Sequence, residues 1–127
     1  MIHEEIVTLE VAKLAKEKGF NERTRYYYET NCVNPKAIEH CWGSGYFNKH
    51  PRAVAAPTQS LLQRWLREEK GYYVYPLFDN VQLMWDWVCR EKTGDKWIPL
   101  VGLEFHLFPT YELALEDALK YTLENLV

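Results

Sequence analysis

The sequence predicts an α+β fold: an antiparallel sheet of about four to six short strands with three helices packed mainly on one face. Three segments space their apolar residues as amphipathic helices do, and the aromatic segments between them alternate as strands do. Short turns join these segments, which favours antiparallel pairing because parallel strands need long crossover connections. We expect the 127 residues to form a single globular domain over residues 1–127.

The first helix is predicted to begin after Thr8, whose hydroxyl can accept a hydrogen bond from a backbone N–H of the first turn. Val11, Leu14 and Ala15 form its apolar side. Gly19 is predicted to end it, because glycine tolerates the left-handed backbone conformation that follows many helices.

Strands and turns are predicted to follow this helix. A strand over residues 25–30 contains three consecutive tyrosines, and residues 31–35 form a turn. A second pair of strands is expected over 37–42 and 46–48, with a glycine-rich bend between them. Residues 49–56 are expected to be an irregular connection.

The middle of the chain is predicted to be a capped helix followed by a hairpin. Thr58 is the expected N-cap and Gly71 the expected stop. The first hairpin strand covers residues 72–78, and Asp79 and Asn80 form the turn because both tolerate a left-handed backbone. The helix has an apolar stripe of four residues: Leu61, Leu62, Trp65 and Leu66.

The last third of the chain is predicted to complete the sheet and add a helix. A strand over 81–90 is followed by a polar turn over 91–95 and by one bent strand, or two short ones, over 97–108. Pro76 places the first hairpin strand at a sheet edge or a bulge, since proline lacks a backbone donor. The second hairpin strand has one face with Leu83, Trp85, Trp87 and Cys89. The last helix begins after Thr110 and buries Leu115, Ala118, Leu119, Thr122 and Leu126.

Composition and charge exclude several classes of protein. Hydrophobic residues make up 47% and charged residues 26% of the chain, as in a folded rather than a disordered protein. The 15 basic and 18 acidic side chains are mixed and give a net charge of −3, so we expect no binding to duplex DNA or to a membrane. The acidic start and the lack of a long apolar segment indicate neither a signal peptide nor a membrane span. We therefore expect a cytoplasmic protein, which also fits an odd number of cysteines.

Cysteine and histidine residues could supply zinc ligands: Cys32, Cys41, Cys89, His40 and His50. Their spacing argues against a zinc site, because the sequence contains no Cys-x-x-Cys and no His-x-x-x-His. We predict no metal and no cofactor, and we interpret the cysteines as ordinary small apolar side chains.

Two arrangements could support catalysis, and each has a simpler interpretation. Cys41 adjoins His40, as in an activated nucleophile, but neighbours on a strand point to opposite faces. Asp86 lies between two tryptophans, where desolvation could raise the pKa of a general acid, with Glu104 as its nearest partner. Asp86 falls on the strand face opposite those tryptophans, so a solvated carboxylate is favoured. We therefore predict no catalytic residue.

The high aromatic content, 15% of the chain with nine tyrosines, is its most unusual property. Tyr26 and Tyr28 share one strand face, as do Tyr73 and Tyr75. If the helices cover the other face of the sheet, these four tyrosines form a platform for a partner, since Tyr and Trp carry much of the binding energy at protein interfaces and also stack on single-stranded bases. Alternatively, they are cross-strand pairs that stabilise the sheet, or the seam of a homodimer. Nucleic acid is the less favoured partner because acidic residues are interleaved with the basic ones.

Three segments carry a resemblance to a known family: TLEVAKLAKEKGF, APTQSLLQRWLREEKGYYVYPLFDN and FPTYELALEDALKYTLENL. Over nearly its whole length the chain resembles a family of small uncharacterised proteins of Bacteroides-group gut bacteria and their prophages or mobile elements. The resemblance implies an accessory phage or mobile-element product. It implies no activity, cofactor or catalytic residue.

Two classes of function remain open. The first is a non-enzymatic module that acts by protein–protein interaction, with an unknown protein partner or as a homodimer. The second is an enzyme whose site is assembled from dispersed polar residues, for which the candidates are Asp86, Glu104, His106 and Cys89. A weak single-stranded nucleic-acid binder is a further alternative to the first.

Overall fold

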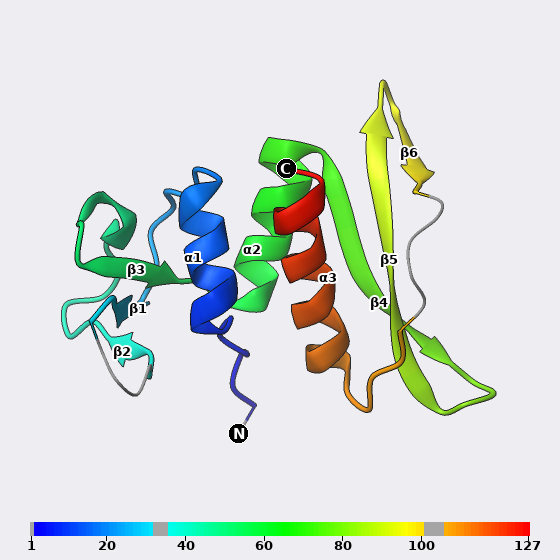
Figure 1. Cartoon of the computed structure of the whole chain (residues 1–127), viewed down its shortest axis with the longest axis horizontal. Coiled ribbons are helices and arrows are strands. Elements are labelled where there is room, and N and C mark those ends of the chain that lie inside the picture. The colour runs from blue at the N-terminus through cyan, green and yellow to red at the C-terminus, as the bar shows by residue number, and fades with distance from the viewer. Residues whose placement is uncertain (1, 32–35, 101–105) are drawn as a thin grey trace. The chain divides into compact units, whose positions relative to one another are not determined.

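A computed structural model describes residues 2–31, 36–100 and 106–127 of the chain (Figure 1). Its described residues form three α-helices and six strands, which confirms the α+β class and the antiparallel pairing. The strands form two three-stranded sheets rather than the one sheet expected. The chain divides into two compact units, Met1–Ser60 and Leu61–Val127, with one sheet in each. The expectation of a single domain stays a prediction.

The first unit contains α1 (Leu9–Glu17) and the sheet β2-β1-β3. Thr8 caps α1 as predicted, since its Oγ1 accepts a hydrogen bond from the backbone N–H of Val11 (3.3 Å). Gly19 has a φ of 95°, which glycine adopts without strain. α1 contacts β3, so this helix covers its own small sheet. The strands are β1 (Tyr26–Glu29), β2 (Ile38–Glu39) and β3 (Ala53–Ala56), with β1 antiparallel to both others.

Two predictions in this unit are wrong. The strand pair over 37–42 and 46–48 does not form: β2 pairs with β1 instead, and a short 3₁₀ turn, η1 (Phe47–Lys49), replaces the second strand. The Asn48 side chain fixes this turn, because it donates a hydrogen bond to the Phe20 carbonyl (2.7 Å) and accepts one from the Ala55 N–H (2.7 Å). The predicted connection over 49–56 contains the strand β3. Most of the predicted turn over 31–35 lies outside the described residues.

The helix α2 (Gln59–Trp65) begins directly after Thr58, as predicted. It continues as one π-helical turn, η2 (Leu66–Lys70), and ends at Gly71, whose φ of 77° confirms the predicted left-handed stop. The Gln63 amide reaches the edge of the second sheet and donates to the Val74 carbonyl (2.7 Å). A side chain thus satisfies one backbone carbonyl, that of Val74, on the outer edge of this sheet.

The second unit contains the sheet β4-β5-β6, made of β4 (Tyr72–Asp79), β5 (Met84–Thr93) and β6 (Lys96–Pro99). β4 is an edge strand, as Pro76 predicted. The hairpin turn is longer than expected, because Asp79 pairs with Met84 and its Oδ1 accepts from the N–H groups of Val81 and Gln82. β5 extends to Thr93, so most of the predicted polar turn over 91–95 is strand. Residues 101–105 of the predicted strand over 97–108 lie outside the described residues.

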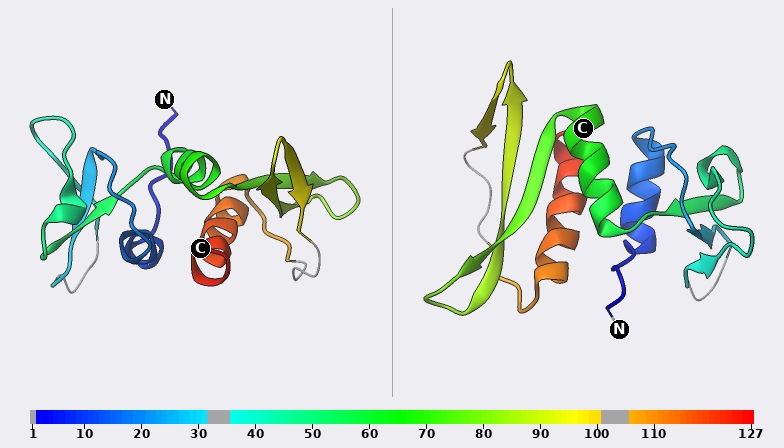
Figure 2. Two further views of the ribbon diagram at one scale, coloured as in Figure 1. Left: turned by 90° about the horizontal axis from the view of Figure 1, so that it is seen from above. Right: turned by 180° about the vertical axis from the view of Figure 1, so that it is seen from behind.

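The helix α3 (Tyr111–Asn125) runs alongside β4 and β5 (Figure 2). Thr110 caps it as predicted, accepting from the N–H of Leu113 through its side chain (3.2 Å). The helix buries four of the five predicted residues and two further ones, whereas the predicted Leu126 is the C-cap and only partly buried. The buried residues are Ala114, Leu115, Ala118, Leu119, Thr122 and Leu123. Each buried leucine contributes about 2 kcal/mol from apolar burial, so this stripe fixes the helix on one face of the sheet.

Candidate functional site

The register of the second sheet assigns each side chain to one of its two faces. Trp85, Trp87 and Cys89 of β5 lie on the face that α3 covers, as their contacts with Tyr111, Asp117 and Thr122 of that helix require. Side chains that pair directly across an antiparallel sheet share a face. The face turned away from α3, here named the open face, therefore carries Tyr73, Tyr75, Leu77, Asp79, Met84, Asp86, Val88, Arg90, Lys92, Trp97 and Pro99.

Three aromatic rings form a continuous cluster on the open face. The ring centroids of Tyr73 and Tyr75 are 4.8 Å apart, and those of Tyr73 and Trp97 are 6.0 Å apart in an edge-to-face arrangement. Such aromatic pairs stabilise a sheet by about 0.5–1.5 kcal/mol beyond their burial. The cluster is only half-buried, and Leu77 beside it on β4 is 55% exposed. The open face thus presents apolar surface to solvent.

Three cationic side chains contact this aromatic cluster. The Arg67 guanidinium, from η2, lies 5.4 Å from the centre of the Tyr73 ring, and the Lys92 ammonium lies 6.0 Å from that of Trp97. The Arg90 Nε donates a hydrogen bond to the Tyr75 hydroxyl (3.0 Å). Cations stack on aromatic faces because the ring quadrupole is negative there. The contacts order three flexible side chains next to the rings.

The four tyrosines predicted to form one platform lie in two different sheets. Tyr73 and Tyr75 belong to the open face, as expected. Tyr26 and Tyr28 belong to β1 in the first unit. Tyr28 is only 7% exposed, and its hydroxyl donates a hydrogen bond to the Val7 carbonyl (2.6 Å). Tyr28 therefore stabilises the first unit, and we restrict the predicted binding role to Tyr73 and Tyr75.

Four residues of the site were not anticipated from the sequence. Arg67 lies outside the predicted apolar stripe of its helix, and its stacking on Tyr73 depends on the turn at Gly71 that brings η2 back beside β4. Arg90, Lys92 and Trp97 depend on the register across β5 and β6. The one available signal was the alternation of Arg90 and Lys92, which predicts that these two cations share a face if the strand continues.

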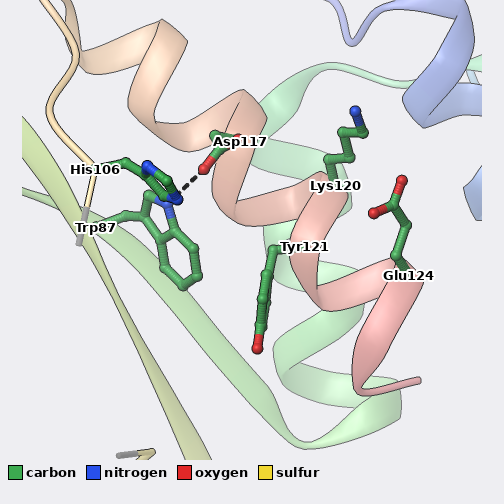
Figure 3. A pocket seen from close by; sticks show the side chains of 6 residues that line it. All are labelled: Trp87, His106, Asp117, Lys120, Tyr121 and Glu124. Atoms are coloured by element: carbon green, nitrogen blue, oxygen red, sulfur yellow. Dashed lines mark hydrogen bonds between the residues drawn. The ribbon is translucent and has the colours of Figure 1, made fainter. Parts of the chain in front are cut away.

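A small hollow on the covered side of the sheet does not have the features of a catalytic site. It encloses about 140 Å³ and is lined by Trp87, His106, Asp117, Lys120, Tyr121 and Glu124 (Figure 3). The Trp87 Nε1 donates to the Asp117 Oδ2 (2.9 Å), a bond that ties β5 to α3. Figure 3 shows His106 beside the Trp87–Asp117 bond, whereas the Lys120 side chain extends away from the Trp87 ring. We interpret the hollow as a packing feature.

Of the four polar residues considered for an enzyme, the three that the structure describes do not form one site. Asp86 lies on the open face, where its carboxylate accepts from the N–H of Trp87 (2.7 Å). Cys89 lies on the covered face, and burial raises the pKa of its thiol to about 11, which keeps it protonated at neutral pH. His106 lines the hollow, and Glu104 lies outside the described residues.

The residues considered for zinc or for a reactive thiol are likewise dispersed. Among the described residues, no group of three or more His, Cys, Asp or Glu side chains is placed to hold a metal ion. Cys41 and Cys89 are free thiols in different units, and Cys32 lies outside the described residues. Cys41 is exposed, whereas the neighbouring His40 ring packs edge-on against Phe47 (5.3 Å).

Comparison with known proteins gives no further identification. No family model matches the chain, and neither a curated protein nor a solved structure matches it significantly. No helix in the described parts of the chain has both the length and the apolar character needed to cross a membrane. A binding role for this protein therefore rests on the open face itself.

Proposed function

We propose that this protein is a non-enzymatic binding module that acts by protein–protein interaction through the open face of the sheet β4-β5-β6. The observation that carries the proposal is the half-exposed cluster of Tyr73, Tyr75 and Trp97, with the exposed Leu77 beside it. Aromatic side chains of this kind dominate the binding energy of protein interfaces. Contiguous apolar surface on a small domain also typically marks an interaction site.

The wider role in this proposal follows the family resemblance of the sequence: an accessory protein of phage or mobile-element type, working in the cytoplasm. The free thiols of Cys41 and Cys89 support a reducing compartment, since an exposed cysteine such as Cys41 is readily oxidised elsewhere. The partner is either a different protein or a second copy of this chain.

Site-specific photo-crosslinking in the cells that naturally express the protein tests the proposal. A photoreactive phenylalanine derivative in place of Leu77 should capture a partner protein, because this side chain is exposed on the open face. The matched control is the same replacement at Leu113, which is exposed to a similar extent, 50% against 55%, but lies on α3. Mass spectrometry of the adducts identifies what each position contacts.

A partner captured from position 77 and not from position 113 supports the proposal. An adduct of the chain with itself, restricted to position 77, identifies the partner as a second copy, and light scattering then gives the stoichiometry. Identical adducts at both positions, or none at position 77, contradict a binding role for the open face.

A further inference from the structure

The charge of the open face is opposite in sign to that of the chain. The protein has a net charge of −3, yet the described side chains of this face include three cations, Arg67, Arg90 and Lys92, against two carboxylates, Asp79 and Asp86. Both carboxylates accept hydrogen bonds from backbone N–H groups next to them in the chain. Complementary potentials across an interface steer partners and exclude wrong ones. A partner of this face is therefore expected to be anionic.

The geometry of the two arginines favours carboxylates. Arg67 lies over the face of Tyr73, and Arg90 is held by its Nε bond to the Tyr75 hydroxyl. A guanidinium has five donors in a planar fork, so these contacts orient each fork while leaving the terminal nitrogens for a bidentate acceptor. Tyr73 pairs directly with Arg90 across the hairpin, and its ring centroid lies 4.8 Å from that of Tyr75, so the two arginines contact neighbouring tyrosines. Two pre-oriented forks on neighbouring tyrosines suit neighbouring Asp or Glu side chains.

The aromatic rings are less suited to single-stranded nucleic acid. Base stacking needs an open ring face. The Tyr73 face is occupied by Arg67, its neighbour Trp97 packs edge-to-face against it, and Lys92 lies over Trp97. Leu77 and Val88 add aliphatic surface, which contacts apolar side chains of a peptide better than a sugar–phosphate backbone.

We propose that the open face binds an acidic protein segment, whose carboxylates pair with Arg67, Arg90 and Lys92 while its apolar side chains contact Tyr75, Leu77 and Val88. This inference rests on the proposed function and adds the chemical class of the partner to it.

Fluorescence anisotropy with three labelled probes tests the inference on the full chain. The probes are a short peptide of mixed glutamate and leucine, the same peptide with glutamine in place of glutamate, and oligothymidine of equal length. The glutamate peptide should bind at least about tenfold more tightly than the glutamine peptide, since one charge-assisted pair accounts for about that factor. The affinity of the glutamate peptide should decrease when the salt concentration is raised from about 0.01 M to about 0.15 M, because salt screens exposed charges.

Variants locate the binding. Arg67→Gln and Arg90→Gln should each lower the affinity for the glutamate peptide by about fivefold to tenfold. Neither variant should change the affinity for the glutamine peptide. Lys13→Gln removes the same charge from an exposed position on α1 and should change the affinity less than about twofold. Circular dichroism spectra that match the unaltered protein show that each variant is folded.

The possible outcomes separate the inference from the proposed function. Equal affinity for the two peptides, with loss of both on Tyr73→Ala, overturns the acidic class and keeps a protein-binding face. Tighter binding of oligothymidine than of the glutamate peptide overturns the inference in favour of nucleic acid. Absence of peptide binding, or equal effects of Arg90→Gln and Lys13→Gln, also overturns it, whereas the crosslink at position 77 decides the proposed function independently.

Discussion

The Cys89 thiol lies on the side of β5 that α3 covers, and only 1% of the residue is exposed. Burial raises the pKa of this thiol from its ordinary value of 9.0 to about 11. A hydrogen bond with Thr122 acts in the opposite direction, but its effect on the pKa is smaller than that of burial. A buried neutral thiol packs as a small apolar group and has little thiolate to react. Within the described parts of the chain, the side chain with the largest pKa shift is thus a structural one.

This shift makes stability depend on alkaline pH. Below pH 9 the thiol is protonated in both the folded and the unfolded state, so the shift has no effect. As the pH rises from 9 to 11, the unfolded state releases the proton first, and the free energy of unfolding falls. We expect the stability difference between the unaltered protein and Cys89→Ala to shrink by about 2 kcal/mol over this range, as urea unfolding at a series of pH values would measure. A difference that is independent of pH would contradict the assignment.

The exposure of individual tyrosines could not be predicted from the sequence. Tyr28 and Tyr75 both occupy alternate positions in tyrosine-rich segments, yet one is buried against Val7 and the other is half-exposed beside Arg90. Alternation predicts which tyrosines share a face of their own strand. It does not predict which face a helix covers, because that depends on residues distant in the sequence.

Helix capping illustrates what is decided at the scale of one element. The Thr110 Oγ1 accepts from the Leu113 N–H (3.2 Å), and the backbone of Thr110 is extended, as an N-cap requires. We expect Thr110→Ala to lower the free energy of unfolding by about 1 kcal/mol, and Thr110→Ser to retain most of it because serine keeps the acceptor. Urea denaturation of the three proteins measures this. Equal losses for both substitutions would show that the methyl group, not the cap, stabilises the site.

The hairpin shows why the strand faces were predicted correctly although its register was not. A two-residue turn at Asp79 and Asn80 would pair Tyr73 with Asp86, whereas the structure pairs Tyr73 with Arg90, four positions further on. Side chains alternate with a period of two, so an even shift leaves every residue on its predicted face. The four-residue turn depends on Asp79 and on a left-handed Leu83 (φ 56°), a conformation rare for leucine and hence not predictable from residue type.

The strand β3 was missed for a related reason. Alanine has a low β propensity, so the run from Ala53 to Ala56, with Val54 as its one β-branched residue, has little local strand signal. Its hydrogen bonds are supplied by other elements: β1 on one edge, and the side chains of Lys16 and Asn48 on the other. Tertiary context overrides local propensity in such a strand.

At the scale of the whole molecule, the question is whether the two compact units unfold together. The boundary between them falls after Ser60, inside α2, which runs from Gln59 to Trp65. Helix formation is cooperative along a continuous segment, so this boundary does not separate two independent helices. We expect a single calorimetric transition, with a van't Hoff enthalpy equal to the calorimetric one, as is usual for chains below about 150 residues. Two resolved transitions would instead indicate two domains.

The sequence by itself determined the α+β class, the caps at Thr8 and Thr110, the stop at Gly71 and the alternation of β4 and β5, because all of these depend on residues close to one another in the chain. Only the tertiary structure decided that the strands form two sheets and that three cations contact one aromatic cluster. These are Arg67 on Tyr73, Arg90 on Tyr75 and Lys92 on Trp97. Composition averages charge over the whole chain and gives a net acidic protein. Folding places particular charges on one face through strand register and helix position, which are set by long-range packing.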